Sequence, residues 1–386
     1  MDGSLKTVVI DPGSSCVKVG FSSDNTPVSI FNNVTGKSKH PLISSGMGGK
    51  DVYVGDEVLS QQRILDIKRP VQRGVIVDEE LLVQTFVHSY EKSLKVDPIS
   101  HPLLLALPSL IGKTVKEDLT QLLFEELSVP SLSMCLGPAL SVFATGRTSG
   151  VVVDIGGGCT EIIPMVDGVP LSQSYCKVQM GGMDLTERLA RDIIASTERL
   201  DFPSLSSSPS LFDIYSKMKE DSCYVSMNFE AELRATAHSK DHSAIHRSHV
   251  FKLPDGKEIT MDKERFLCSE GLFHPSILGK ESAGIPELVA GVVSEVGVDV
   301  RSRMWSSVIL SGGTTLLPRF NERMDTELSE LSNGKKVSIV ANENRLILNW
   351  MGGSLVASLP TFRDLFVSKE EYEEIGPSIC LKKGFF

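Results

Sequence analysis

VVIDPGSSCVKVGF at residues 8–21 and VVVDIGGGCTEIIPM at residues 151–165 are two versions of one pattern. Each is a β-branched run, an aspartate (Asp11 or Asp154), a turn of small residues and a second strand-like run. β-branched residues favour strands, while glycine and serine favour tight turns. A strand–Asp–turn–strand unit that occurs twice predicts two related half-domains that face each other.

The small residues of both turns suit a phosphate group. They lack bulk, so the backbone can approach an anion, and their successive N–H groups can form an anion-binding concavity. They are Gly13, Ser14 and Ser15 in the first turn and Gly156, Gly157 and Gly158 in the second. The serine hydroxyls are further donors, and Lys18 can reach a phosphate oxygen. Alternatively, each turn is an ordinary hairpin turn closed by Asp and Gly.

Two acidic residues and a third glycine turn extend the nucleotide hypothesis. Asp11 and Asp154 end their strands pointing to the same place, where two carboxylates can hold Mg²⁺, most simply through its water shell. Residues 306–316 (SSVILSGGTTL) are an apolar strand, two glycines and threonines suited to open a helix. Such a turn lets a nucleotide lie against the backbone.

Together with these motifs, segments along nearly the whole chain resemble the actin family, within the wider group of actin, chaperone and sugar-kinase ATPases. The segments are HPLLLALPSL (101–110), ATGRTSGVVVD (144–154), GGMDLTERL (181–189), KEDSCYVSMNFE (219–230), LPDGKEITMDKERF (253–266), LSGGTTLLPRF (310–320), WMGGSLVASLPTF (350–362) and VSKEEYEEIGPSI (367–379). The resemblance implies an α/β, actin-like ATPase fold. Two duplicated lobes, each a mixed sheet flanked by helices, then enclose a nucleotide cleft.

The resemblance also implies a division of the chain. The core of the first lobe takes residues 1–32, 70–144 and 348–386, and the core of the second takes 145–180 and 281–347. Residues 33–69 and 181–280 are insertions that cap the two lobes. Independently, apolar spacing predicts helices over 114–127 and 186–200, and the Ser/Pro-rich residues 201–212 predict a surface loop.

By resemblance, ATP or ADP with Mg²⁺ is the expected cofactor. The phosphate and metal positions of the family match Asp11, Ser14, Lys18, Asp154, Gly156 and Gly157. Gly182 falls where the family meets the nucleotide, and Lys219 and Glu220 match a pair beside the ribose and base. The adenosine side matches Gly312, Gly313 and Thr314, and Leu316 completes the predicted binding set.

Three purine contacts of the family differ. Ser216, Leu317 and Leu346 stand where the family has an arginine, a tyrosine and a lysine. Each change removes a polar or stacking contact and leaves an apolar wall. We expect the base to be held more loosely, or base selectivity to be reduced.

The two groups that help the family to organise the attacking water also differ, because Gly137 replaces a glutamine and Glu161 a histidine. Pro138 suits the first turn of a helix, so we expect that helix to persist. Losing one orienting group costs on the order of 10²–10³ in rate. Glu161 can instead act as a base or hold the water. We expect a site that retains ATP, with restored hydrolysis as the alternative.

Composition narrows the functional classes. The net charge of the 386 residues is −10, without a long basic block, which argues against nucleic-acid binding. Seven cysteines without metal-type spacing indicate reduced, intracellular thiols. Neither a signal segment nor a membrane-spanning run is expected. These features predict an intracellular protein, and the resemblance to actin implies a cytoplasmic, cytoskeletal location.

Histidines 238, 242, 246 and 249 recur at helical spacing. This pattern allows a zinc site, but a polar, solvated segment is the preferred interpretation.

The resemblance bears on assembly as well. Residues 39–57 resemble the mobile loop that docks into the next subunit of a filament, with glycines at 46, 48 and 49. The receiving surface differs, since Val166 and Val169 replace tyrosines and Lys280 replaces a methionine. Self-assembly is therefore expected to be weak or absent. An apolar cleft can take a partner helix; its residues are Phe143, Met351, Leu355, Leu359 and Leu365.

The leading hypothesis is a structural, nucleotide-binding actin-related subunit with little turnover. The alternatives are a divergent filament-forming actin that hydrolyses ATP and, less favoured, a small-molecule kinase or chaperone ATPase on the same fold.

Overall fold

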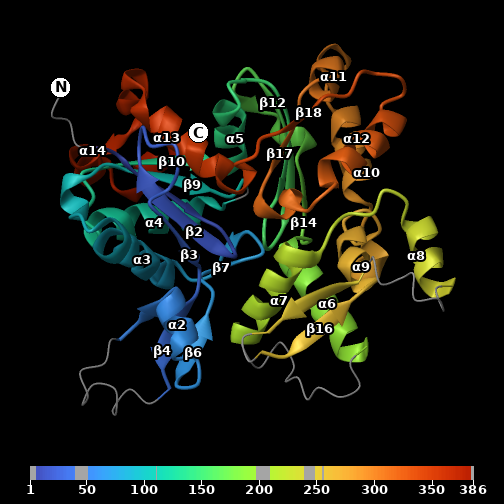
Figure 1. The fold of residues 1–386 in the computed structure, drawn as a ribbon. Helices are drawn as coiled ribbons and strands as arrows, with labels where there is room; N and C mark the ends of the chain where they lie inside the picture. Colours follow the sequence, from blue (N-terminus) through green and yellow to red (C-terminus); the bar gives the residue numbers. More distant parts are fainter. Residues whose placement is uncertain are drawn as a thin grey trace.

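The computed structural model describes residues 6–39, 51–109, 111–196, 209–238, 248–253 and 256–383. Two mixed β-sheets dominate this part of the chain and lie side by side (Figure 1). The strands of the first sheet are, in spatial order, β19 (Val367–Ser368), β10 (Ser131–Leu136), β9 (Leu103–Leu107), β1 (Val8–Pro12), β2 (Cys16–Phe21) and β3 (Ser29–Asn32). Those of the second are β13 (Val169–Pro170), β12 (Thr160–Val166), β11 (Gly150–Ile155), β17 (Val308–Ser311) and β18 (Ile339–Ala341), with β14 (Cys176–Val178) also paired to β12.

The two sheets repeat one topology. In the first, β1 is antiparallel to β2 and parallel to β9, which is parallel to β10. In the second, β11 is antiparallel to β12 and parallel to β17, which is parallel to β18. β1–β2 and β11–β12 are the two copies of the sequence motif, so the predicted duplication is confirmed at the level of strand order and direction.

Helices cover the sheets. Those that follow or flank the first sheet are α3 (Glu79–His88), α4 (Lys113–Glu125), α5 (Gly137–Ala144), α13 (Leu348–Ser358) and α14 (Lys369–Ile375). The second sheet is accompanied by α10 (Ile285–Glu295), α11 (Val298–Trp305) and α12 (Phe320–Leu331). Each sheet buries its own apolar cluster, for example Ile10, Leu103 and Phe86 in the first and Val153, Leu310 and Phe320 in the second.

Two smaller units extend from the sheets (Figure 1). One contains β4 (Thr35–Ser38), β5 (Tyr53–Val54), α2 (Asp56–Ser60) and β6 (Leu65–Lys68). The other contains α6 (Gly182–Ser196), α7 (Pro209–Ser222), α8 (Phe229–His238), β15 (His249–Lys252), β16 (Glu258–Met261) and α9 (Glu264–Glu270). In the chain, the short hairpin of β7 (Val71–Gln72) and β8 (Val75–Ile76) lies between β6 and α3.

Helices α5 and α13 pack against each other in close contact. The backbone of α13 approaches α5 so closely at Gly352 that a side chain there would overlap the Leu140 carbonyl. Trp350, fully buried on α13, donates its indole N–H to the Val9 carbonyl at 3.0 Å. These contacts hold α13 against α5 and against β1, the first strand of the first motif copy.

Several local predictions are corrected. The predicted loop over 201–212 is wrong at its end, because α7 begins at Pro209, where a proline suits the first helical turn; residues 201–208 lie outside the described residues. The threonines after Gly313 form a single 3₁₀ turn, Gly313–Leu316, and the α-helix begins only at Phe320. The predicted helices over 114–127 and 186–200 correspond to α4 and α6, and α6 begins four residues earlier than predicted, at Gly182.

Pro138 lies in the first turn of α5, as expected. No helix in the described segments is long and apolar enough to cross a bilayer. Residues 40–50, which hold the glycines of the predicted docking loop, lie outside the described residues, as do His242 and His246.

Candidate functional site: a cavity between the two hairpins

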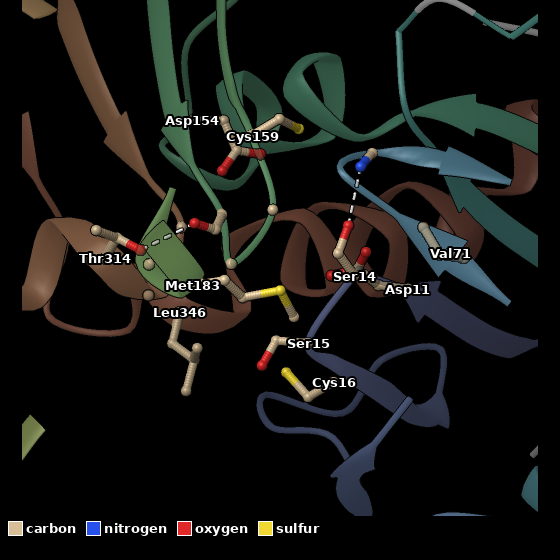
Figure 2. A pocket seen from close by; sticks show the side chains of 18 of the residues that line it. Asp11, Ser14, Ser15, Cys16, Val71, Asp154, Cys159, Met183, Thr314 and Leu346 are labelled. Atoms are coloured by element: carbon tan, nitrogen blue, oxygen red, sulfur yellow. Dashed lines mark hydrogen bonds between the residues drawn. The ribbon is translucent and has the colours of Figure 1, made fainter. Parts of the chain in front are cut away.

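A cavity of about 910 Å³ is lined by residues of both sheets. The turns of both motif hairpins and the glycine turn after β17 form part of its wall. Every residue of the predicted site lines it: Asp11, Gly13, Ser14, Ser15, Lys18, Gly137, Asp154, Gly156, Gly157, Gly158, Glu161, Gly182, Lys219, Glu220, Gly312, Gly313, Thr314 and Leu316. Figure 2 shows Asp11 and Ser14 on one side of this cavity and Asp154 and Thr314 on the other.

The two motif turns are closed in the same way. The Gly13 N–H donates to the Cys16 carbonyl and the Gly156 N–H to the Cys159 carbonyl, each at 3.0 Å. Both turns are hairpin turns, as the simpler interpretation of the motif proposed. Within the described part of the chain, the N–H groups of Ser14, Ser15, Gly157 and Gly158 donate to no backbone carbonyl. Donors of this kind, on turns that line a cavity, are available to an anion.

The turns also contact each other across the two sheets. A side chain on Gly157 would bring its Cβ to 2.7 Å from that of Ser15. The Ser14 hydroxyl accepts the Gly74 N–H at 2.9 Å, which links the first turn to the β7–β8 hairpin (Figure 2). On the opposite wall, the Thr314 hydroxyl donates to the Gly156 carbonyl at 2.9 Å and joins the third turn to the second (Figure 2).

Charged groups collect beside the turns. Lys18 and Asp11 form a buried ion pair at 2.8 Å. Burial alone lowers the pKa of Lys18, but its interactions with Asp11, Cys16 and Asp154 outweigh it, so the pKa is raised. Burial raises the pKa of Asp154 to about 6; the charges of Glu161 and Asp11 add to this rise, while hydrogen bonding from Asn349 opposes it. Lys18 thus lies between two carboxylates, those of Asp11 and Asp154, and interacts with both.

This donor set fits Mg²⁺ bound together with phosphate. Two carboxylates, Asp11 and Asp154, line the cavity, and no cluster of three or more His, Cys, Asp or Glu side chains within the described ranges is arranged to hold a metal ion. Mg²⁺ keeps several waters and is commonly held by one or two carboxylates plus substrate phosphates. Asp11 and Asp154 are therefore suited to a hydrated ion that a phosphate chain helps to bind.

Lys219 and Glu220 are engaged with the protein. The Lys219 ammonium donates to the Gly182 carbonyl and to the Thr186 hydroxyl, both at 2.9 Å, so it ties α7 to the start of α6. Burial lowers its pKa. Glu220 accepts a hydrogen bond from Ser216 at 3.1 Å. Ser216, the position that the family fills with arginine, thus has a carboxylate partner.

The cavity wall beside the third turn includes apolar side chains. Leu317 is buried and Leu346 is partly exposed, and both line the cavity. Leu346 lies against Gly313 of the third turn, where a side chain on the glycine would meet its Cδ1 at 2.7 Å. Figure 2 shows Leu346 and Thr314 together at this wall. A base bound here would meet aliphatic surface.

Glu161 is held by three neighbouring groups. Lys177 lies 3.0 Å from its Oε1, the Ser109 hydroxyl donates to its Oε2 at 2.8 Å, and the Ser109 N–H donates to the same oxygen at 3.4 Å. Its side chain is 7% exposed. The carboxylate is therefore paired with a cation and hydrogen-bonded through Oε2, while Oε1 is buried and accepts no hydrogen bond within the described residues.

Sequence reasoning missed the partners that join the lobes at the site. They are Ser109, Lys177, Asp184 and Asn349. Asp184 pairs with Arg73 at 3.0 Å and with Lys280 at 2.9 Å, so Lys280 has the polar partner that its position requires. Arg73 and Asp184 are 111 residues apart in sequence, and no local pattern links them.

The apolar residues proposed to receive a partner helix are not equivalent. Phe143 and Met351 are partly buried against a core cluster of the first sheet. Leu355 and Leu359 are 47% and 45% exposed.

Val166 and Val169, which replace two tyrosines of the family's receiving surface, pair with each other across the β12–β13 turn, and Val169 is exposed.

The chain was also compared with models of known families. It matches the actin family model over residues 3–385, which is nearly its whole length. The match agrees with the two mixed sheets flanked by helices, and the predicted α/β, actin-like ATPase fold is confirmed. This chain belongs to the actin family.

Proposed function

We propose that this protein binds Mg²⁺ with ATP or ADP in the cavity, hydrolyses ATP slowly or not at all, and serves as a structural subunit of a larger cytoskeletal assembly. Family membership supports a cytoskeletal role. The finer parts of the proposal depend on the residues of the cavity.

Binding of the phosphates rests on the two hairpin turns. The available N–H groups of Ser14, Ser15, Gly157 and Gly158 can donate to phosphate oxygens from both sheets. Asp11 and Asp154 would hold the hydrated metal ion, which when bound neutralises phosphate charge. Lys18 pairs with Asp11 at 2.8 Å and so holds its side chain in place.

The observation that carries slow hydrolysis is the state of Glu161. Its carboxylate is bound by Lys177 and Ser109, so it is poorly placed to accept a proton from water. Gly137 offers no side chain. Phosphoryl transfer depends mainly on positioning and electrostatics, and a site without a free orienting group should be slow by about 10²–10³.

The expected place of action is the cytoplasm, within the cytoskeleton. Leu355 and Leu359 offer exposed apolar surface to a partner helix. Phe143, Met351 and Leu365, the other residues of the predicted cleft, are partly buried.

The proposal is tested by adding Mg²⁺-ATP to purified protein over a range of protein concentrations. Phosphate release and sedimentation are measured on the same samples. We expect bound nucleotide, phosphate release slowed by about 10²–10³ relative to a site with an orienting group, and no critical concentration. A sharp critical concentration with coupled phosphate release would favour a filament-forming actin that cycles ATP instead.

A further inference from the structure

The space beside Gly137 is filled by the side chain of a distant residue. A Cβ on Gly137 would lie 2.9 Å from Nδ2 of Asn349 and 3.2 Å from its Cγ. Asn349 is in the first turn of α13, and Gly137 begins α5. Both line the cavity. The missing side chain at position 137 has therefore left room that the Asn349 carboxamide occupies.

The Asn349 carboxamide is hydrogen-bonded at both ends. Its Nδ2 donates to Oδ2 of Asp154 at 3.1 Å, and its Oδ1 accepts from the Ser141 hydroxyl at 2.5 Å. Ser141 in turn lies 3.0 Å from the Ser311 hydroxyl on β17. Ser141 and Ser311 are buried. This chain of hydrogen bonds joins α13 and α5 to β11 and β17 of the second sheet.

We propose that Asn349 is a positioning residue of the nucleotide site: its carboxamide holds the Asp154 carboxylate in the orientation that binds the hydrated metal ion, and Gly137 is the residue that makes room for it. The inference rests on the proposed function, because it assigns a task within the same site. Asn349 acts through Asp154.

Two features support a positioning task over simple packing. A carboxylate that turns freely presents its oxygens in many directions, and a donor on Oδ2 selects one of them. The donor is itself fixed, since the hydroxyl of Ser141 holds its other end. Groups that orient a metal-binding side chain typically contribute 10–100-fold in metal affinity.

The geometry also predicts coupling between positions 137 and 349. A methyl group at residue 137 would lie 2.9 Å from Nδ2 of Asn349, so the amide must shift relative to Asp154. Gly137 has no left-handed backbone conformation, so alanine fits the helix itself. Gly137→Ala should therefore act on the metal site through Asn349 rather than through folding.

The experiment uses the full chain with a ribose-labelled fluorescent ATP. The apparent affinity for Mg²⁺ is obtained from nucleotide release across a magnesium titration, and thermal stability is recorded in parallel. The variants are Asn349→Ala, Gly137→Ala and the double variant. Asn228→Ala is the matched control. This change also removes a carboxamide hydrogen bond, which Asn228 Oδ1 accepts from the Ala231 N–H, and Asn228 does not line the cavity.

We expect Asn349→Ala and Gly137→Ala each to weaken the apparent Mg²⁺ affinity by about 10-fold or more. The double variant should be no weaker than Asn349→Ala, because both changes remove one interaction. Asn228→Ala should leave Mg²⁺ affinity unchanged. Unchanged Mg²⁺ affinity in Asn349→Ala, or additive losses in the double variant, would overturn the inference while nucleotide binding stands. No Mg²⁺-dependent binding in the unmodified chain would overturn the proposed function and the inference with it.

Discussion

Replacing Asp154 by asparagine should stabilise the nucleotide-free protein. Burial raises the pKa of Asp154 to about 6 from 3.8. The folded state therefore keeps a proton that the unfolded state has lost between about pH 4 and pH 6, and stability falls as pH rises through that interval. A shift of about 2 units at about 1.4 kcal/mol each gives a penalty of about 3 kcal/mol above pH 6.

Asparagine has a similar shape and does not ionise, and its amide oxygen can still accept from Asn349. The difference in unfolding free energy between Asp154→Asn and the unmodified chain should grow from near zero at pH 4 to about 3 kcal/mol at pH 7. Urea denaturation of protein stripped of nucleotide and metal measures it at each pH. Asp118→Asn, an exposed change on α4, is the control and should show little effect.

The same substitution should weaken Mg²⁺-nucleotide binding, because a neutral amide replaces one of the two carboxylates suited to the ion. A nucleotide-free Asp154→Asn protein that is less stable than the unmodified chain at pH 7, or a stability difference independent of pH, would refute the reasoning. Burial of the Asp154 carboxylate would then not destabilise the folded protein as we describe.

Other changes test the packing and the charges. Gly352→Ala should lower the unfolding free energy measured by urea denaturation by about 3 kcal/mol or more, because α5 and α13 must separate. Gly291→Ala, which adds a methyl group in open space on α10, should be neutral or stabilising. Equal effects of the two changes would contradict the close contact at Gly352. Lys18→Met should cost about 3–5 kcal/mol by the same assay, since it leaves Asp11 buried without its partner; a neutral result would mean that Asp11 finds another partner. Glu161→Gln should leave the slow phosphate release unchanged, because Lys177 and Ser109 already hold the carboxylate; a loss of tenfold or more would identify Glu161 as the base.

The parts of the fold that the sequence predicts are those with local signals. The β-branched runs and small-residue turns at 8–21 and 151–165 predict two hairpins, and the repetition of this pattern predicts two related sheets. Pro138 marks a helix start that the structure contains. The start of α7 at Pro209 was missed because the serines and prolines before it dominate the local composition.

The residues of the cavity also differ in whether a local sequence signal predicts them. Asp11 and Asp154 are the penultimate residues of β1 and β11, and glycines follow these strands, so their place at the strand ends can be predicted from the sequence. Asn349 and Lys177 have no such signal, because each meets its partner only after segments far apart in the chain have folded together. Asn349 is 195 residues from Asp154. The sequence also identifies Glu161 as an unusual residue for its position. It does not predict that the Glu161 carboxylate pairs with Lys177 and accepts a hydrogen bond from Ser109.

The nucleotide that the protein carries tests the central claim most directly. Protein purified under native conditions is denatured, and the released nucleotide is identified by chromatography, both at once and over a time course after ATP and Mg²⁺ are added. We predict about one bound nucleotide per chain, with added ATP remaining as ATP throughout. Steady conversion of bound ATP to ADP would contradict the account and show that another group organises the attacking water.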